Sequence, residues 1–250
     1  MTLRAALERF AALDTVLVAT DYDGVVAPIV ADPAAAFPLP GTVPALTSLA
    51  ALPGVAVALV SGRDRATLGR LSGAAAPLVT VGSHGAEWEE GLEGVLSPAL
   101  IDLRASVLAD LTAIAERFPG AAVEPKPLGA ALHVRNVVDP SAGPLALEQA
   151  RRGPAALPGV HATDGKAVLE LTVLDASKGR ALTVLRERTG AAGVLYLGDD
   201  VTDEKAFAVL TGPEDVSVKV GDGATAARFR VDAPADARAV FEELLALRRA

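Results

Sequence analysis

The chain has 250 residues, of which 51% are hydrophobic, which is enough for a packed core and too many for a disordered chain. Its 23 Lys and Arg residues against 31 Asp and Glu residues give a net charge of -8, which argues against broad electrostatic binding to nucleic acid or to an anionic membrane. The lack of cysteine excludes disulfides and thiolate metal sites, and it fits a reducing compartment.

The amino-terminal segment and the most apolar stretch give no sign of export or membrane insertion. Glu8 and Asp14 precede the first short apolar run, so we expect no secretion signal. Residues 49–60 are interrupted by Pro53 and Gly54 and are too short to span a bilayer. We therefore expect a cytoplasmic monomer whose partner is a small molecule, with no nucleic-acid or membrane partner.

Short apolar segments alternate with amphipathic segments along most of the chain. The expected strands are residues 15–20, 55–60, 78–81 and 193–197, and the expected helices are residues 42–52, 64–71, 178–188 and 202–210. Each strand is apolar throughout and runs into a polar segment, as in a parallel sheet that is buried on both faces. This alternation predicts a doubly wound, Rossmann-like α/β core, with ligands beyond the carboxyl ends of the strands.

The middle of the chain has a different order of elements. A long amphipathic helix at residues 99–117 precedes two runs of alternating polarity, a further helix and another pair of runs. This order predicts a small α+β domain with an antiparallel sheet, inserted as a cap. We expect the cap at residues 99–175 and the catalytic core at residues 1–98 and 176–250.

Two carboxylates, Asp21 and Asp23, directly follow the first expected strand. One carboxylate can attack phosphorus to form an acyl phosphate, and the other can protonate the leaving oxygen and later deprotonate water. An isolated pair of this kind is more often a solvated loop. Other chemical groups elsewhere in the chain favour the catalytic interpretation.

A second acidic segment follows the last expected strand. Asp199 and Asp203 lie where a helix begins, so capping of that helix is the alternative to metal binding. Mg²⁺ prefers oxygen ligands and keeps several waters, which suits carboxylates from two loops together with a phosphate oxygen. We assign Asp199 to the metal, and Asp203 as a second ligand or as support behind it.

Two segments offer groups that can bind a phosphoryl group. Ser61 follows the second expected strand and can donate its hydroxyl, helped by backbone N–H groups around Gly62 where the next helix starts. Lys178 opens another helix and can neutralise phosphoryl charge. A lone Ser-Gly turn or a lone helix-start lysine is weak evidence, but their order along the chain with the two acidic segments makes coincidence improbable.

These four elements resemble the four motifs of the haloacid-dehalogenase superfamily. The resemblance implies that Asp21 is the nucleophile and that Asp23 is the general acid and base, which also offers its backbone carbonyl to Mg²⁺. It further implies that Ser61 and Lys178 bind the phosphoryl group and that Asp199 is a metal ligand.

Six longer segments resemble the trehalose-6-phosphate phosphatase family in the same order: DYDGVVAPI, VSGRD, GSHGAEWE, VEPKPLGAALHVR, GKAVLEL and GDDVTDEKAF. The resemblance implies hydrolysis of trehalose 6-phosphate and a cap whose charged side chains hold the sugar. The sugar-binding residues that it implies are His84, Glu87, Glu124, Lys126, His133, Arg135, Lys166 and Glu170.

Some of these residues have simpler explanations. Arg135 and Lys166 can be solvated charges on a sheet face, and His133 can be a core histidine. Tyr22 and Trp88 can stack on a sugar, but packing or support of the aspartate loop is equally expected.

The sequence is also compatible with three other functions. A related phosphatase acting on sucrose phosphate or a mannosyl-phosphoglycerate would share the catalytic core. A regulatory domain that binds sugar phosphate without turnover would be expected to have damaged motifs, whereas Asp21, Asp23, Lys178 and Asp199 are all present. A receiver-like signalling domain phosphorylated on Asp21 would need neither the cap nor Asp23.

Overall fold

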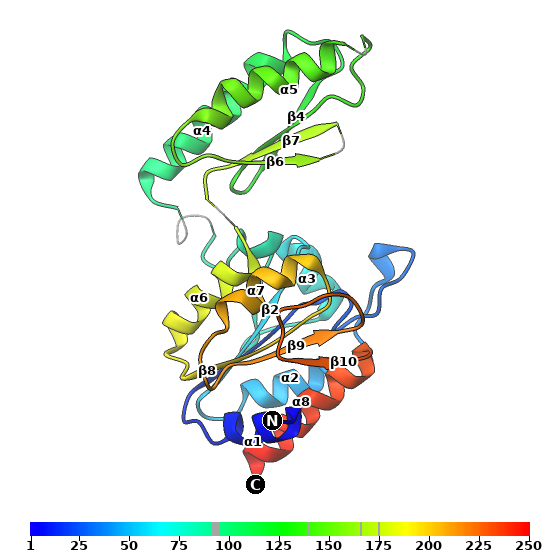
Figure 1. Cartoon of the computed structure of the whole chain (residues 1–250), viewed down its shortest axis with the longest axis vertical. Coiled ribbons are helices and arrows are strands. Elements are labelled where there is room, and N and C mark those ends of the chain that lie inside the picture. The colour runs from blue at the N-terminus through cyan, green and yellow to red at the C-terminus, as the bar shows by residue number, and fades with distance from the viewer. Residues whose placement is uncertain (92–95, 140, 166, 175) are drawn as a thin grey trace. The chain divides into compact units, whose positions relative to one another are not determined.

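The structure is a computed structural model that describes residues 1–91, 96–139, 141–165, 167–174 and 176–250. It divides into two compact units, Met1–Glu89 with Ser177–Ala250 and Glu90–Ala176. The second unit is inserted into the first, because the chain leaves the first unit after its third strand and returns before the helix that starts at Lys178 (Figure 1). The divisions follow residues 89 and 176, compared with the 98 and 175 expected from the sequence.

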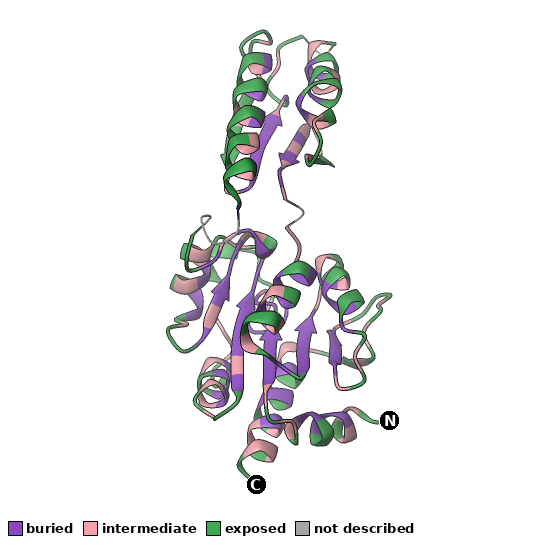
Figure 2. Cartoon of the chain, turned by 90° about the vertical axis from the view of Figure 1, so that its left-hand side faces the viewer, coloured by how far each residue is buried: buried purple, intermediate pink, exposed green. Residues whose placement is uncertain are grey.

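The first unit contains a six-stranded parallel sheet with the order β10-β9-β8-β1-β2-β3. Its strands are β1 (Val16–Thr20), β2 (Val55–Val60), β3 (Val79–Val81), β8 (Gly193–Gly198), β9 (Val216–Val220) and β10 (Phe229–Val231). Every residue of β1 and β8 is buried, as Figure 2 shows for the central strands. Both faces of the sheet must therefore be covered.

Helices cover this sheet on both faces. They are α1 (Leu3–Ala11), α2 (Thr42–Ala50), α3 (Arg65–Ser72), α6 (Lys178–Thr189), α7 (Glu204–Val209) and α8 (Pro234–Arg249). Helices α1, α2 and α8 pack together on one face, and α6 and α7 lie on the other (Figure 1). Leu7, Leu46 and Phe241 join one buried cluster with the strands, and each buried side chain of this size contributes roughly 1.5–3 kcal/mol to folding.

The second unit contains a four-stranded antiparallel sheet with the order β4-β5-β7-β6. Its elements are α4 (Pro98–Ala115), β4 (Ala122–Lys126), β5 (Gly129–His133), α5 (Ala142–Arg152), β6 (His161–Gly165) and β7 (Val168–Thr172). Leu132, Leu169 and Leu171 are buried on the sheet face that α4 and α5 cover. Side chains alternate between faces along a strand, so the opposite face carries the polar residues.

The expected fold class, an α/β parallel core with an inserted α+β cap, is confirmed by these two sheets. The described residues also contain the short 3₁₀ helices η1 (Pro33–Ala35), η2 (Ser83–Gly85), η4 (Pro154–Ala156) and η5 (Val201–Asp203). Across the described ranges, none of the helices has both the length and the apolar character needed to cross a membrane.

Candidate active site

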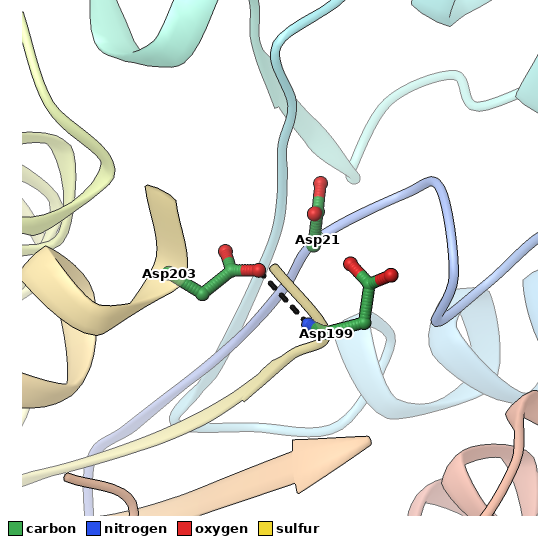
Figure 3. Close-up of side chains that lie close together, drawn as sticks. All are labelled: Asp21, Asp199 and Asp203. Carbon is green, nitrogen blue, oxygen red and sulfur yellow. Dashed lines mark hydrogen bonds between the residues drawn. The ribbon is translucent and has the colours of Figure 1, made fainter. Parts of the chain in front are cut away.

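Three aspartates lie together at the carboxyl ends of β1 and β8 (Figure 3). Asp21 follows β1, Asp199 follows β8, and Asp203 ends the short helix η5. One carboxylate oxygen from each lies within 4.8 Å of the other two. Because β1 and β8 are parallel neighbours in the sheet, the loops that follow them leave from the same edge. An oxygen-only group of this kind can hold a divalent metal ion.

Lys178, the first residue of α6, connects two of these aspartates. Its buried Nζ donates hydrogen bonds to Asp21 Oδ2 at 2.6 Å and to Asp203 Oδ1 at 2.8 Å. Burial by itself lowers the pKa of Lys178, but the Asp21 and Asp203 carboxylates outweigh it, so the pKa is raised. Lys178 therefore carries a positive charge at the centre of the site.

Asp203 is fully buried and is held by four donors. Oδ1 accepts from Lys178 and from the hydroxyl of Tyr196 at 2.6 Å. Oδ2 accepts from the backbone N–H groups of Asp199 and Asp200, each at 2.9 Å. Because both oxygens are engaged, this geometry favours the supporting role for Asp203 over the role of a metal ligand. Nothing in the sequence motif pointed to Tyr196.

The position of Asp199 depends on close contacts with its neighbours. Gly24 has a φ of +73°, and a Cβ added there would lie 1.9 Å from Asp199 Oδ2, so only glycine fits beside this carboxylate. The buried Lys219 on β9 donates to the Asp199 backbone carbonyl, a contact that the sequence did not suggest.

The charge balance of the site fits a bound cation. Burial, followed by the Asp203 carboxylate, raises the pKa of Asp199 to about 6. Burial also raises the pKa of Asp21 well above its usual value, against the opposing effect of Lys178. Three carboxylates close together thus exceed the positive charge of the adjacent lysine, and a divalent ion would offset the difference.

Asp23 is placed near these groups but outside the cluster. Its carboxylate accepts hydrogen bonds from Arg63 Nε at 2.6 Å and from Arg63 Nη2 at 2.7 Å. Tyr22, between the two aspartates, is fully buried and donates its hydroxyl to the Ala36 carbonyl at 2.7 Å. Tyr22 therefore supports the aspartate loop and is not available to stack on a sugar.

The loop after β2 and the turn at η2 hold each other in place. Ser61 is buried, and its hydroxyl oxygen accepts from the Arg63 N–H at 3.1 Å. Ser83 and His84 have φ values of 48° and 56°, and their N–H groups donate to the carbonyls of Arg63 and Ser61, both at 2.8 Å. The His84 ring covers Gly62, where an added Cβ would lie 2.5 Å from Cε1. These contacts bring His84 beside the candidate phosphate-binding loop.

Glu87 and Trp88 support that turn. The Glu87 carboxylate accepts from the Arg65 N–H and from the Ser83 hydroxyl, both at 2.7 Å. Trp88 is buried and donates a hydrogen bond from Nε1 to the Gly85 carbonyl at 2.9 Å. The centroid of its ring lies 4.7 Å from the guanidinium carbon of Arg188. Trp88 is thus a packing residue, and both oxygens of Glu87 already accept hydrogen bonds from the protein.

The cap residues named from the sequence cluster on the polar face of the second sheet. Glu124 accepts hydrogen bonds from Lys126 Nζ at 2.8 Å and pairs with His133 Nε2 at 2.9 Å. Glu170 on β7 and Glu124 on β4 both lie opposite Ala131 of β5, so they share one face with a small residue between them. His133 is half-exposed on this face and is not a core residue.

The two remaining candidates are Arg135 and Lys166. Arg135 is exposed beyond the end of β5. Lys166 lies outside the described residues, so its expected sugar contact stays a prediction.

Comparison with known proteins identifies relatives along nearly the whole chain. The trehalose-phosphatase family model matches residues 19–235. A trehalose-phosphate phosphatase of Mycobacterium avium is 39% identical over 243 residues, which are 90% of this chain and 61% of that protein. One from Mycobacterium tuberculosis H37Rv is 37% identical, over 86% of this chain and 57% of that protein. The chain thus spans less than two thirds of the length of these relatives.

A solved structure gives the same result for the fold. The trehalose-6-phosphate phosphatase of Aspergillus fumigatus superimposes with a TM-score of 0.77 at 30% identity, and the match covers 97% of each chain. The resemblance noted in the sequence is confirmed by these matches.

Proposed function

The chain belongs to the trehalose-phosphatase family, and we propose that it hydrolyses trehalose 6-phosphate to trehalose and phosphate. The observation that carries this proposal is the hydrogen-bonded group of Asp21, Lys178 and Asp203, placed at the carboxyl edge of the sheet of a chain that matches this family. The group has what phosphoryl transfer needs: a carboxylate nucleophile and a fixed positive charge.

Asp21 attacks the phosphorus atom, and the bond from phosphorus to the sugar oxygen breaks. One Asp21 oxygen accepts from Lys178 and the other accepts from the Tyr22 N–H at 2.7 Å, so the orientation of the carboxylate is set before substrate arrives. The resulting acyl phosphate is then hydrolysed by water. Lys178, with the Ser61 hydroxyl and the backbone at Gly62, binds the phosphoryl oxygens.

Asp23 acts as the general acid and then as the general base. It gives a proton to the leaving sugar oxygen in the first step and takes a proton from the attacking water in the second. Its half-buried position two residues after Asp21 supports this assignment.

A magnesium ion would be held by Asp21, Asp199 and the Asp23 carbonyl, and when bound it supplies positive charge that offsets the negative charge of the phosphoryl group. Asp203 keeps the Asp199 loop in position through its four hydrogen bonds.

The sugar is recognised by charged side chains that a wrong ligand would leave unpaired. The proposed sugar contacts are His84, Glu124, Lys126, His133, Arg135, Lys166 and Glu170. Glu87, whose two oxygens accept from Arg65 and Ser83, supports the turn that carries His84. Glu124, Lys126 and Glu170 are the strongest members, because they lie on one polar face of the cap sheet. His84 contacts the part of the substrate near the phosphate, since its ring covers Gly62.

A phosphate-release assay tests this function. Trehalose 6-phosphate, sucrose 6-phosphate and glucose 6-phosphate are compared with Mg²⁺ and with EDTA. We expect release that depends on Mg²⁺ and prefers trehalose 6-phosphate. Preference for another sugar phosphate would overturn the substrate and keep the chemistry, whereas no release from any of them would favour a binding domain without turnover.

A further inference from the structure

Arg63 holds the side chain of Asp23 with a two-pronged contact. Nε and Nη2 each donate to a different oxygen of the carboxylate, at 2.6 and 2.7 Å. This parallel geometry matches a planar guanidinium to a planar carboxylate and fixes the rotation of the Asp23 side chain as well as its position.

Arg63 is itself held at its side chain and at its backbone. The Arg63 side chain is only 15% exposed, and its guanidinium carbon lies 5.8 Å from the centroid of the buried Tyr22 ring. The Arg63 N–H donates to the Ser61 hydroxyl oxygen, and its carbonyl accepts from the Ser83 N–H. Arg63 therefore links the aspartate loop after β1 to the loop after β2.

We propose that Arg63 is a positioning residue that orients Asp23 for proton transfer to and from the sugar oxygen and the attacking water. This inference rests on the proposed function. A general acid must present one oxygen to the leaving group within hydrogen-bond reach, and a small misplacement is costly. If one Asp23 oxygen turns to the sugar, the other can keep its bond to Arg63, so the carboxyl group pivots about a fixed point.

This role differs from binding of the phosphoryl group. Two of the Arg63 donors are already directed at Asp23. Phosphoryl oxygens can instead be bound by Lys178, which contacts Asp21, and by the Ser61 loop, which follows the neighbouring strand β2. Loss of Arg63 should therefore affect kcat for poor leaving groups, with little change in KM.

The test compares two substrates in the wild type and in variants at Arg63. Trehalose 6-phosphate has an alkoxide leaving group that needs protonation, and p-nitrophenyl phosphate has a stable leaving group that needs little. We expect Arg63→Met to lower kcat for the sugar phosphate on the order of 10- to 100-fold. For the aryl phosphate we expect a loss below about threefold. Arg63→Lys should lie between wild type and Arg63→Met, because an ammonium group makes one of the two contacts.

Arg70→Met serves as the matched control. Arg70 is exposed on the nearby helix α3, so the substitution removes the same charge without touching Asp23, and both rates should stay at the wild-type level. In an Asp23→Ala background, Arg63→Met should have no further effect on the ratio of the two rates. Guanidinium ion at low concentration should partly restore sugar-phosphate turnover in Arg63→Ala.

The outcomes separate this inference from the proposed function. If the wild-type protein hydrolyses both substrates but Arg63→Met and Arg63→Lys slow them equally, the positioning role is wrong and the function stands. Faster sugar-phosphate turnover in these variants, or a rise in KM alone, would also overturn it. If the wild type releases phosphate from neither substrate, both the function and the inference fail.

Discussion

Two clusters of charged side chains, one in each unit, have similar hydrogen-bond lengths and different surroundings. In the core, Lys178 lies 2.6 and 2.8 Å from its two aspartates, and in the cap, Glu124 lies 2.8 and 2.9 Å from Lys126 and His133. The Lys178 side chain is 2% exposed, whereas that of Lys126 is 33% exposed.

Burial therefore distinguishes the two clusters, and distance does not. A buried charge that loses its partner is destabilising, because nothing replaces the lost contact. A half-exposed charge that loses its partner is solvated by water, and its ion pair contributes little. In the core cluster, removal of one charged group should therefore destabilise the fold. In the cap cluster, a charged group can exchange its partner for water or for a ligand at little cost in free energy.

The largest expected effect is on turnover when the nucleophile is replaced. Asp21→Asn should lower kcat on the order of 10⁴-fold or more, because the amide cannot form the acyl phosphate. The fold should be retained, since burial already disfavours the ionised form of Asp21 and Lys178 keeps its contact with Asp203. Phosphate release and thermal unfolding by circular dichroism measure the two effects. Near-normal turnover would contradict the assignment of the nucleophile.

The second largest expected effect is a difference in stability between two matched Lys→Met substitutions. Lys178→Met should lower the free energy of unfolding by about 3–5 kcal/mol, because it leaves two buried carboxylates without their cation. Lys126→Met, in the cap, should lower it by less than about 1 kcal/mol. Urea unfolding of both variants without added metal gives the comparison. Equal losses in the free energy of unfolding would show that burial does not make the core cluster more important for stability than the cap cluster.

A smaller effect is expected on substrate recognition. Lys126→Met should raise KM for trehalose 6-phosphate by about tenfold, the effect of losing one charged hydrogen bond to the sugar. Its KM for p-nitrophenyl phosphate should not change, because that substrate has no sugar. Steady-state kinetics with both substrates check this, and an equal rise in both KM values would place Lys126 outside the sugar site.

The smallest effect is a change in the titration of Glu124. The hydrogen bond from Lys126, followed by that with His133, lowers the pKa of Glu124. Because the pKa of Glu124 is lower in the folded state, these hydrogen bonds stabilise the fold above the pKa of the unfolded chain, which is about 4.3. That stabilisation is lost as the pH falls through the pKa of the folded state. In Lys126→Met, carboxyl NMR should show the Glu124 pKa moving up. Asp64, whose pKa is lowered by the Thr67 N–H, should not shift.

Much of the core could be predicted because its pattern is local. Strands β1, β2 and β8 are short apolar runs, and the candidate catalytic residues Asp21, Ser61 and Asp199 directly follow them. The last two strands in the chain, β9 and β10, and the terminal helices α1 and α8 were not predicted. Their sequences carry no motif, and their pairing with the rest of the sheet depends on long-range contacts.

The amino-acid sequence by itself determined the parallel core, the inserted cap and the order of the catalytic motifs, because apolar periodicity and motif spacing are properties of neighbouring residues. Only the tertiary structure decided which motif residues face one another. It also revealed supporting residues that no motif contains: Tyr196 behind Asp203 and Lys219 on the Asp199 carbonyl. Arg63 is part of a motif, but its contact with Asp23 joins two loops 40 residues apart, which meet only because β1 and β2 are adjacent in the folded sheet.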